Sequence, residues 1–478
     1  MSNLTQLETD LKTPIAMLVT LLYQLVQEQS GPEAKFAQRE VLALEISNEV
    51  VRQVLQQDLQ QMADRQTVDV LIDQHPYHQH EPGTVEYHSL CGPLQVCRYT
   101  YRPRGMHNGK TVVALELQAG LIHRATPALA YDVAQGYAKE DMRSHQESLQ
   151  SAHRVPPSRT TLETLAKAIG GEVQVQSPVI EPIVRQQEEV PPKAASLSLG
   201  LDRTTVPMEE KREPGQAPKT RRKKRTKPYV RKPPEPVDVN WRMAYIGTVA
   251  VADGDGETLF TRRYTALPQE SAEGIMKRIA ADIQAYRGQR PELAVGVIQD
   301  GAPELWNVAR EELCKIMPER DWVEGIDRYH LEERLGKALE LLPMEAGQRK
   351  TLLKQWQEKL DEDDTMIDKI ESTLRAWYNR LDETTASKLW EQLVYIRNNK
   401  DRMRYATLLS KGLPVGSGIT EAACKSVIGQ RTAGSGQRWC DEGVSAALTL
   451  RALHRSARLP AFWTYYSSTY CKEVLPAA

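Results

Sequence analysis

Between residues 195 and 326 the sequence alternates short apolar runs with longer amphipathic stretches, and the order of these segments leaves few folds open. Three strands in a row are followed by two strands that alternate with helices, which predicts a mixed α/β sheet. The strands are predicted at residues 195–201 (ASLSLGL), 243–252, 258–265, 293–298 (LAVGVI) and 322–326, and the helices at 270–286 and 303–316.

Two of these predicted strands end in an aspartate. Asp202 follows SLGL, and Asp300 follows AVGVIQ and precedes Gly301. Strand ends are where open α/β sheets collect ligands and catalytic groups. Two carboxylates held close together repel each other unless a cation lies between them, and divalent cations favour oxygen ligands. Each aspartate taken singly is equally well explained as a turn former or a helix cap, so the pair indicates a metal site without deciding it.

A third carboxylate, Glu421, lies near the start of a helix predicted after Gly416-Ser417-Gly418. Acidic residues stabilise helix N-termini, so helix capping is the structural alternative to a catalytic role. The serine does not indicate a hydrolase, because a nucleophile elbow needs G-x-S-x-G and this chain has VGSGI.

The remaining segments predict a second, mainly helical region and a large helical insertion. Residues 1–171 are expected to be mainly helical, with a small β-hairpin at 85–101 and a candidate helix-turn-helix at 138–171. A plain helical hairpin gives the same pattern as a helix-turn-helix. Residues 172–194 are rich in Pro, Gln and Val, which is typical of a linker. Residues 331–409 have charged helical patterns and no strand signal, which predicts an all-helical insertion.

Charge is concentrated in one segment. The whole chain has a net charge of −1, but residues 211–232 contain eleven Lys or Arg and one acid, Glu213, so this segment is about +10 and the rest about −11. The sequence therefore predicts a basic loop at 211–236 that contacts a polyanion, with a solvated loop as the alternative. Its densest part consists of Arg221, Arg222, Lys223, Lys224 and Arg225.

Composition predicts a soluble, cytoplasmic protein. Hydrophobic residues make up 40% and charged residues 26%, and the sequence contains neither an apolar run of about 18 residues nor a basic signal-peptide start. The six cysteines form no CxxC pair, which favours reduced thiols over a disulfide framework. A structural zinc site remains an alternative for one cluster, although its Cys-x5-Cys spacing differs from the paired ligands of zinc sites. That cluster comprises His75, His78, His80, His88, Cys91 and Cys97.

Four blocks of this sequence resemble a known family when they are taken in order. They are GLDRTTVPM, IQDGAPELWN, IDRYHLEERL, and LPVGSGITEAACKSVIGQRTAGSGQRW followed by LTLRAL. Together they are similar to the bacterial insertion-sequence transposases of the Kra type, which are related to Mutator-like elements. The resemblance covers about residues 195–465 and leaves 466–478 as a C-terminal tail.

The resemblance implies a ribonuclease H-like catalytic domain with a DDE set of acids. In that fold the first Asp lies on the first strand, the second lies just after the fourth strand, and the Glu lies on a later helix. Asp202, Asp300 and Glu421 match these three positions. The helical insertion at 331–409 matches the insertion that such transposases carry before the Glu helix, whereas the basic loop is longer than the family pattern predicts.

Further residues are carried over from the resemblance. Asp327 and His330, spaced Asp-x-x-His, match an accessory signature of the Mutator-like relatives, although His330 is also explained as a core or helix-start histidine. Arg431 and Trp439 match an Arg and a Trp that follow the Glu in the family. Arg431 is therefore a candidate DNA contact, and packing is the alternative for Trp439.

The implied activity is DNA transposition. Two Mg²⁺ ions, for which Mn²⁺ should substitute, would flank the scissile phosphate about 4 Å apart, with Asp202 bridging both ions. The expected reactions are cleavage at transposon ends and strand transfer into target DNA. The expected partners are double-stranded terminal repeats, target DNA and further copies of the chain, as a homodimer or higher oligomer on DNA in the nucleoid.

Three other functions remain open at this stage. One is a catalytically inactive or domesticated sequence-specific DNA-binding protein. Another is a helical structural or regulatory protein whose acids are helix caps. The third is a ribonuclease H-like nuclease that performs no strand transfer.

Overall fold

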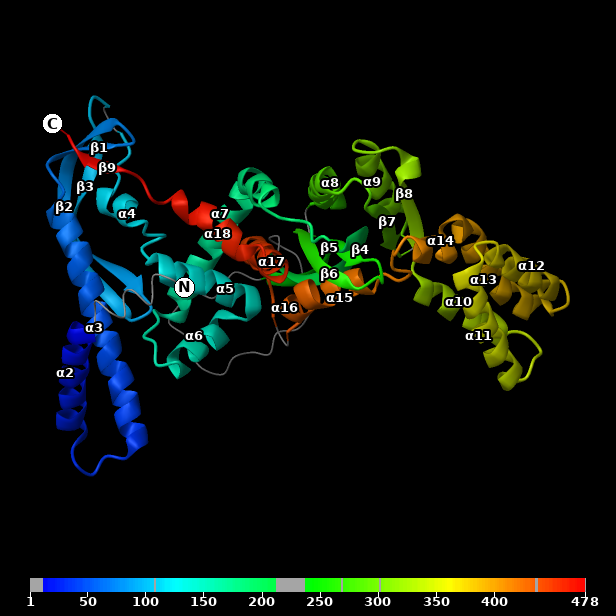
Figure 1. Ribbon diagram of the computed structural model, residues 1–478, viewed down its shortest axis with the longest axis horizontal. Coiled ribbons are helices and arrows are strands. Elements are labelled where there is room, and N and C mark those ends of the chain that lie inside the picture. Colours follow the sequence, from blue (N-terminus) through cyan, green and yellow to red (C-terminus); the bar gives the residue numbers. More distant parts are fainter. Residues whose placement is uncertain are drawn as a thin grey trace. The chain divides into compact units, whose positions relative to one another are not determined.

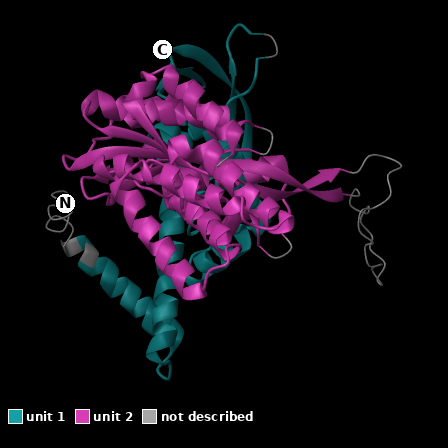
Figure 2. Ribbon diagram, turned by 90° about the vertical axis from the view of Figure 1, so that its right-hand side faces the viewer, with its two compact units in different colours: residues 1–173, 463–478 teal, residues 174–462 magenta. Residues whose placement is uncertain are grey.

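The computed structural model describes residues 12–106, 109–211, 237–267, 270–300, 302–434 and 437–477. The chain forms two compact units, one of residues 1–173 with 463–478 and the other of residues 174–462 (Figure 2). Each unit combines helices with one sheet, so the fold class is mixed α/β. No helix in the described part of the chain is both long and apolar enough to cross a membrane.

The first unit begins with two long helices and contains a four-stranded antiparallel sheet of order β3-β2-β1-β9 (Figure 1). Buried Tyr87, Leu94 and Val96 of the hairpin pack with Leu59 of α3 and form part of its core. The helices are α2 (Lys12–Ser30), α3 (Phe36–Asp64), α4 (Ala114–Ala119), α5 (Pro127–Lys139), α6 (Met142–Ser151) and α7 (Arg159–Gln186). The strands are β1 (Asp69–Ile72), β2 (His75–Ser89), β3 (Gly92–Pro103) and β9 (Val474–Pro476).

The hairpin and the C-terminal tail both differ from the sequence prediction. The hairpin is longer than 85–101, because β2 and β3 together run from residue 75 to residue 103. The tail supplies β9 as an edge strand on β1, with Leu71 opposite Leu475. Residues 474–476 are too few for an alternating pattern to be recognised in the sequence, so this pairing is set by tertiary structure.

Helix α7 also differs from the prediction, because residues 172–186, assigned to a linker, continue the helix that begins at Arg159. Val173, Ile180 and Val184 recur at helical spacing and are buried. Their burial outweighs the cost of two internal prolines, each about 3 kcal/mol in a helix interior. Residues 152–158 separate α6 from α7, a longer connection than the roughly 3–4 residues of a helix-turn-helix.

The second unit contains a five-stranded mixed sheet of order β6-β5-β4-β7-β8. Strand β5 is antiparallel to β4 and β6, whereas β4, β7 and β8 are parallel to one another. The strands are β4 (Ala194–Lys211), β5 (Val237–Asp253), β6 (Thr258–Ala266), β7 (Ala294–Gln299) and β8 (Trp322–Ile326). The strand predictions hold in number and order, and β8 has the predicted bounds. The predicted bounds 195–201 and 243–252 are too short, because β4 and β5 continue to pair with each other as far as Lys211 and Val237. Asp202, predicted to follow the first strand, therefore lies within it.

Helices α8 (Ala272–Gln289) and α9 (Pro303–Cys314) share a core with one face of this sheet (Figure 1). Leu197, Leu199 and Leu201 point to this face because alternate residues of a strand face the same side. Gly200 and Asp202 therefore point to the opposite face. The predicted basic loop at 211–236, including Arg221, Arg222, Lys223, Lys224 and Arg225, lies outside the described residues apart from Lys211.

The predicted helical insertion follows β8 and has its own hydrophobic core. Ile298 of β7 and Ile326 of β8 join this core, so the insertion packs on the β7–β8 side of the sheet (Figure 1). Its helices are α10 (Arg328–Glu340), α11 (Ala346–Glu362), α12 (Met366–Tyr378), α13 (Glu383–Asn399) and α14 (Tyr405–Ser410).

After the insertion the chain returns to the sheet. It forms α15 (Gly418–Ala423), a π-helical turn (Cys424–Gly429) and α16 (Gln430–Thr432), followed by α17 (Asp441–Arg455) and α18 (Leu459–Ser468). Short π-helical segments are rare and often occur at functional sites.

Candidate metal centre

Asp202 lies on β4, the central strand of the second sheet, opposite Ile246 of β5. Burial raises the pKa of its carboxyl group, and the nearby charges of Asp300 and Glu421 raise it further. The Arg203 amide donates to Asp202 Oδ1 at 2.7 Å, and the Cys424 thiol donates to the same carboxylate. Both hydrogen bonds lower the pKa of Asp202 and so partly offset the effect of burial. Asp202 is therefore a half-buried acid that shares its surroundings with two other acids.

Asp300 follows the last residue of β7, the parallel neighbour of β4. The two strands are held together next to the acids, because the Leu201 amide donates to Oε1 of fully buried Gln299 at 3.2 Å. Asp300 itself is exposed. Leu199 of β4 pairs with Val297 of β7, and the same register continued by three residues sets Asp300 beside Asp202.

Glu421 lies on α15, and Gly200 of β4 and Thr248 of β5 allow this helix to pack closely on the sheet. The hydroxyl groups of Thr420 and Thr248 are 2.7 Å apart and buried. At Gly200 a Cβ atom would lie 2.6 Å from the Ile298 carbonyl oxygen and would also press on Oγ1 of Thr420. The absence of a side chain at residue 200 therefore allows the helix that carries Glu421 to approach β4.

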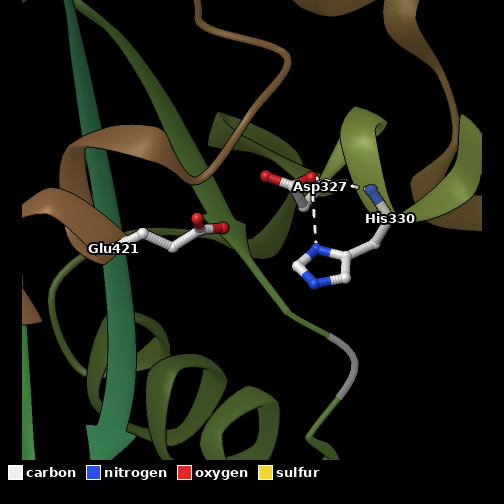
Figure 3. A group of neighbouring side chains, drawn as sticks. All are labelled: Asp327, His330 and Glu421. Carbon is white, nitrogen blue, oxygen red and sulfur yellow. Dashed lines mark hydrogen bonds and ion pairs between the residues drawn. The ribbon is translucent and has the colours of Figure 1, made fainter. Parts of the chain in front are cut away.

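Glu421 also belongs to a tighter group with Asp327 and His330 (Figure 3). One ligand atom from each of these residues lies within 4.8 Å of the other two. Asp327 is 2% exposed and caps α10 by accepting from the His330 amide at 3.0 Å. The His330 Nδ1 lies 3.2 Å from Asp327 Oδ1, without the geometry of a hydrogen bond.

Ser417 connects the two acids of this group. Its Oγ lies 2.7 Å from Asp327 Oδ2 and 2.7 Å from Glu421 Oε1, and its amide also donates to Asp327. Burial opposes ionisation of Asp327, but the hydrogen bonds from Ser417 and from the His330 amide outweigh burial and lower its pKa. A serine hydroxyl has one proton and donates to one carboxylate at a time. The group is therefore short of positive charge, which is the condition that a bound cation relieves.

Two further residues face the acids from neighbouring elements. Burial raises the pKa of the Cys424 thiol to about 12, and the charges of Asp202 and Glu421 add to this effect, so the thiol stays protonated. Burial likewise raises the pKa of Tyr395 on α13 to about 12, with contributions from Asp300 and Asp327. The hydroxyl of Tyr395 is buried and has no hydrogen-bond partner among the described residues.

Sequence reasoning missed Ser417, Cys424 and Tyr395. Ser417 and Cys424 are four residues before and three residues after Glu421, so helical spacing alone places them on the face that Glu421 presents. Tyr395 has no comparable signal, because it lies on α13 of the helical insertion, far from these acids in sequence.

Arg431 and Trp439 pack against each other. Arg431 is 3% exposed, and its guanidinium carbon lies 4.8 Å from the centre of the Trp439 ring. The Trp439 backbone pairs with β4 through Pro207 and Glu209. Burial of Arg431 favours a packing role over DNA contact in this conformation.

The histidines and cysteines of the alternative zinc cluster form no group of three with ligand atoms within 4.8 Å in the described part of the hairpin. Cys91 is buried and Cys97 is exposed, and all six cysteines of the chain are free thiols.

No protein-family model and no curated protein sequence matches this chain. Among solved structures it is similar to a Drosophila P element transposase strand transfer complex, at 10% identity and a TM-score of 0.25, over 73% of this chain and 81% of the other. It is also similar to a Mos1 transposase paired-end complex with the left transposon end, at 10% identity and a TM-score of 0.15, over 60% and 78% of the two chains. Similarity at this level is too low to carry an argument about fold or function.

Proposed function

We propose that this protein is a DNA transposase of the DDE type, which hydrolyses and transesterifies DNA phosphodiester bonds in a metal-dependent manner. One observation carries the proposal: α15, which bears Glu421, packs on the face of β4 that bears Asp202 through Gly200 and the Thr420–Thr248 contact, and the β4–β7 register brings in Asp300 from the next strand. Acids so far apart in sequence come close together only where the tertiary structure packs their strands and helix against one another.

The order of these acids along the fold supports the ribonuclease H-like assignment. Asp202 lies on the first strand of the mixed sheet, Asp300 follows its fourth strand, and Glu421 lies on a helix beyond the insertion. These are the positions that the resemblance to Kra-type transposases implies. The four sequence blocks that carry the resemblance include all three acids.

The donor set fits Mg²⁺, with Mn²⁺ as its substitute, because carboxylate oxygens dominate it. Asp202, Asp300 and Glu421 would hold two ions, and Asp327 with His330 would be accessory ligands on the Glu421 side. When bound, such a pair supplies activation of the attacking oxygen and stabilisation of the leaving oxygen.

The chain's own residues orient this centre. Asp202, held on the central strand by a hydrogen bond from the Arg203 amide, would be a ligand of this centre. Ser417 holds Glu421 and Asp327 in a fixed relation through one hydroxyl group. Cys424 donates to Asp202 as a neutral thiol, which restrains that carboxylate without adding charge.

The proposed partner is double-stranded DNA, namely terminal repeats and target, bound by a homodimer or higher oligomer. We assign recognition of the transposon ends to residues 1–171 and sequence-independent binding of the DNA backbone to the basic segment 211–232. Arg221, Arg222, Lys223, Lys224 and Arg225 would contribute phosphate contacts there.

The test is a plasmid assay with Mg²⁺ or Mn²⁺ that scores nicking of supercoiled DNA and joining of an added 3′-hydroxyl oligonucleotide. The wild type should nick and join, whereas Asp300→Asn and Glu421→Gln should do neither and still bind DNA. Asp255→Asn, in the exposed β5–β6 turn, is the matched control and should retain activity. Wild-type activity in Asp300→Asn would refute the assignment.

The same assay separates the alternatives. Nicking without joining identifies a nuclease that performs no strand transfer. DNA binding without any metal-dependent nicking identifies a catalytically inactive or domesticated DNA-binding protein.

A further inference from the structure

The first unit contains a turn whose backbone is strained at two adjacent residues. His123 and Arg124 have φ of 50° and 64°, in the left-handed region. They form a two-residue turn, because the Ile122 amide donates to the Ala125 carbonyl at 2.9 Å and the Ala125 amide to the Ile122 carbonyl at 2.8 Å. Turns with both central residues at positive φ favour Asn-Gly, so His-Arg is a costly choice for the backbone.

Neighbouring backbone groups hold the turn in this conformation. The His88 amide donates to the Arg124 carbonyl at 2.8 Å, and the Thr126 amide donates to the His88 carbonyl at 2.9 Å. Both hydrogen bonds tie the turn to the end of β2. Strain that is fixed by its surroundings in this way points to a use for the side chains concerned.

Local packing accounts for the histidine of this pair. Its Nε2 lies 3.1 Å from Glu172 Oε2 on α7, and its ring meets the Tyr470 ring edge-on at 5.9 Å. The Tyr470 hydroxyl donates to the same Glu172 carboxylate. His123 therefore anchors the turn, whereas these contacts leave Arg124 unexplained.

Arg124 is exposed and lines a cavity of about 300 Å³ together with His88 and three threonines of α7. These threonines are Thr160, Thr161 and Thr164. The two acids of this part of α7 have other partners, since Glu163 pairs with Lys167 at 2.9 Å and Glu172 pairs with His123. Within the described residues no carboxylate forms an ion pair with Arg124.

The Thr164 hydroxyl donates to the Thr160 carbonyl at 2.9 Å, so Thr164 lines the cavity without a free donor, whereas the Thr161 hydroxyl lies 2.9 Å from the Ser158 hydroxyl and either of the two can donate. We propose that Arg124, with the hydroxyl groups of Thr160 and Thr161, forms a binding site for a backbone phosphate of double-stranded DNA and sets the position of α7 on the duplex. Arginine and threonine side chains are common donors to DNA phosphates, and such contacts position a protein without reading sequence. The proposal rests on the proposed function, because it takes DNA to be the partner.

The experiment uses the full-length protein without divalent metal and a mixed-sequence duplex of about three helical turns. Binding is followed by fluorescence anisotropy between about 50 and 200 mM salt. Arg124→Gly removes the guanidinium group and also relieves the positive φ. Its melting temperature should equal or exceed that of the wild type, while the slope of log affinity against log salt should fall by about 0.9, the loss of one phosphate contact.

The matched control is Gln74→Gly. Gln74 has φ of 66° in the two-residue turn between β1 and β2, it is exposed, and it carries no charge. This variant should gain stability and keep the wild-type slope, and Arg124→Lys should also keep the slope. Inorganic phosphate titrated by calorimetry should produce no binding heat, since one arginine and two hydroxyl groups hold a phosphate only when the duplex supplies other contacts.

An unchanged slope in Arg124→Gly would overturn the inference, and so would an equal fall in Gln74→Gly, which would attribute the change to the turn backbone. Binding of inorganic phosphate as tight as that of the duplex would overturn the assignment to DNA. The plasmid assay tests the proposed activity independently of this binding experiment. If the wild type fails to nick DNA but Arg124→Gly still reduces the salt slope, the proposed activity is refuted and the phosphate-binding site is supported.

Discussion

Gly200→Ala should separate assembly of the proposed metal centre from stability of the fold. Gly200 lies two residues before Asp202 on β4 and faces the helix that carries Glu421. A Cβ atom at this position would lie 2.6 Å from the Ile298 carbonyl oxygen, whereas ordinary contact begins near 3.4 Å. The difference, about 0.8 Å, must be created by moving β4 and β7 apart, because a backbone carbonyl cannot turn aside as a side chain can. The added methyl group would also displace the Thr420 hydroxyl of α15.

Two consequences follow, of different size. Overpacking should lower the free energy of unfolding by about 1–3 kcal/mol, with about 1 kcal/mol more if the Thr420–Thr248 hydrogen bond is lost. The effect on catalysis should be larger, because a displacement of about 1 Å between catalytic groups lowers rates by roughly 100-fold. We therefore expect nicking to fall by about that factor in protein that is still folded.

The matched control is Gly247→Ala, one strand away on β5. A Cβ atom there would press on Ile275 and Ile279 of α8, on the face of the sheet away from α15. This variant should lose stability to a similar degree and retain nicking. Both variants should be assayed well below their melting temperatures, with stability measured by denaturant unfolding. Equal nicking per folded molecule in the two variants would refute the role of Gly200 in seating Glu421.

Asp202→Asn should raise the melting temperature near neutral pH. The pKa of Asp202 in the folded protein is raised above 3.8, so ionisation of this carboxyl group lowers the free energy of unfolding as the pH rises through that folded-state pKa. The stability gained by the variant should therefore vanish below about pH 4, where the carboxyl group is protonated in both states. Thermal unfolding across that pH range measures this, and a variant less stable than wild type at neutral pH would contradict it. Tyr395→Phe should raise the free energy of unfolding by about 1 kcal/mol, because the buried hydroxyl lacks a partner; a loss of stability in denaturant unfolding would show that the hydroxyl has one. Deletion of residues 211–232, which carry about +10, should flatten the salt dependence of DNA binding far more than Arg124→Gly does, and an anisotropy slope equal to the wild type's would exclude that segment from the interface.

The sequence predicted the α/β unit well because its signals are local. Period-two alternation and apolar runs mark β4 to β8, and β8 begins and ends where the pattern predicts. Asp300 follows β7 directly, as predicted, whereas Asp202, predicted to follow its strand, lies within β4, which continues to Lys211. The same reasoning failed at residues 172–186, where two prolines suggested a linker, while burial of Ile180 and Val184 maintains the helix.

By itself the sequence determined which residues are chemically equipped to bind a metal and on which kind of element each one lies, because alternation, helical spacing and turn residues are properties of neighbours in the chain. Only the tertiary structure decided which of them meet. The approach of Glu421 to Asp327 and His330 depends on Ser417, and the seating of its helix depends on Gly200 and Thr248. Apart from the local Ser417–Glu421 hydrogen bond, these contacts join residues 90 or more positions apart, and their geometry is set by packing that no local pattern encodes.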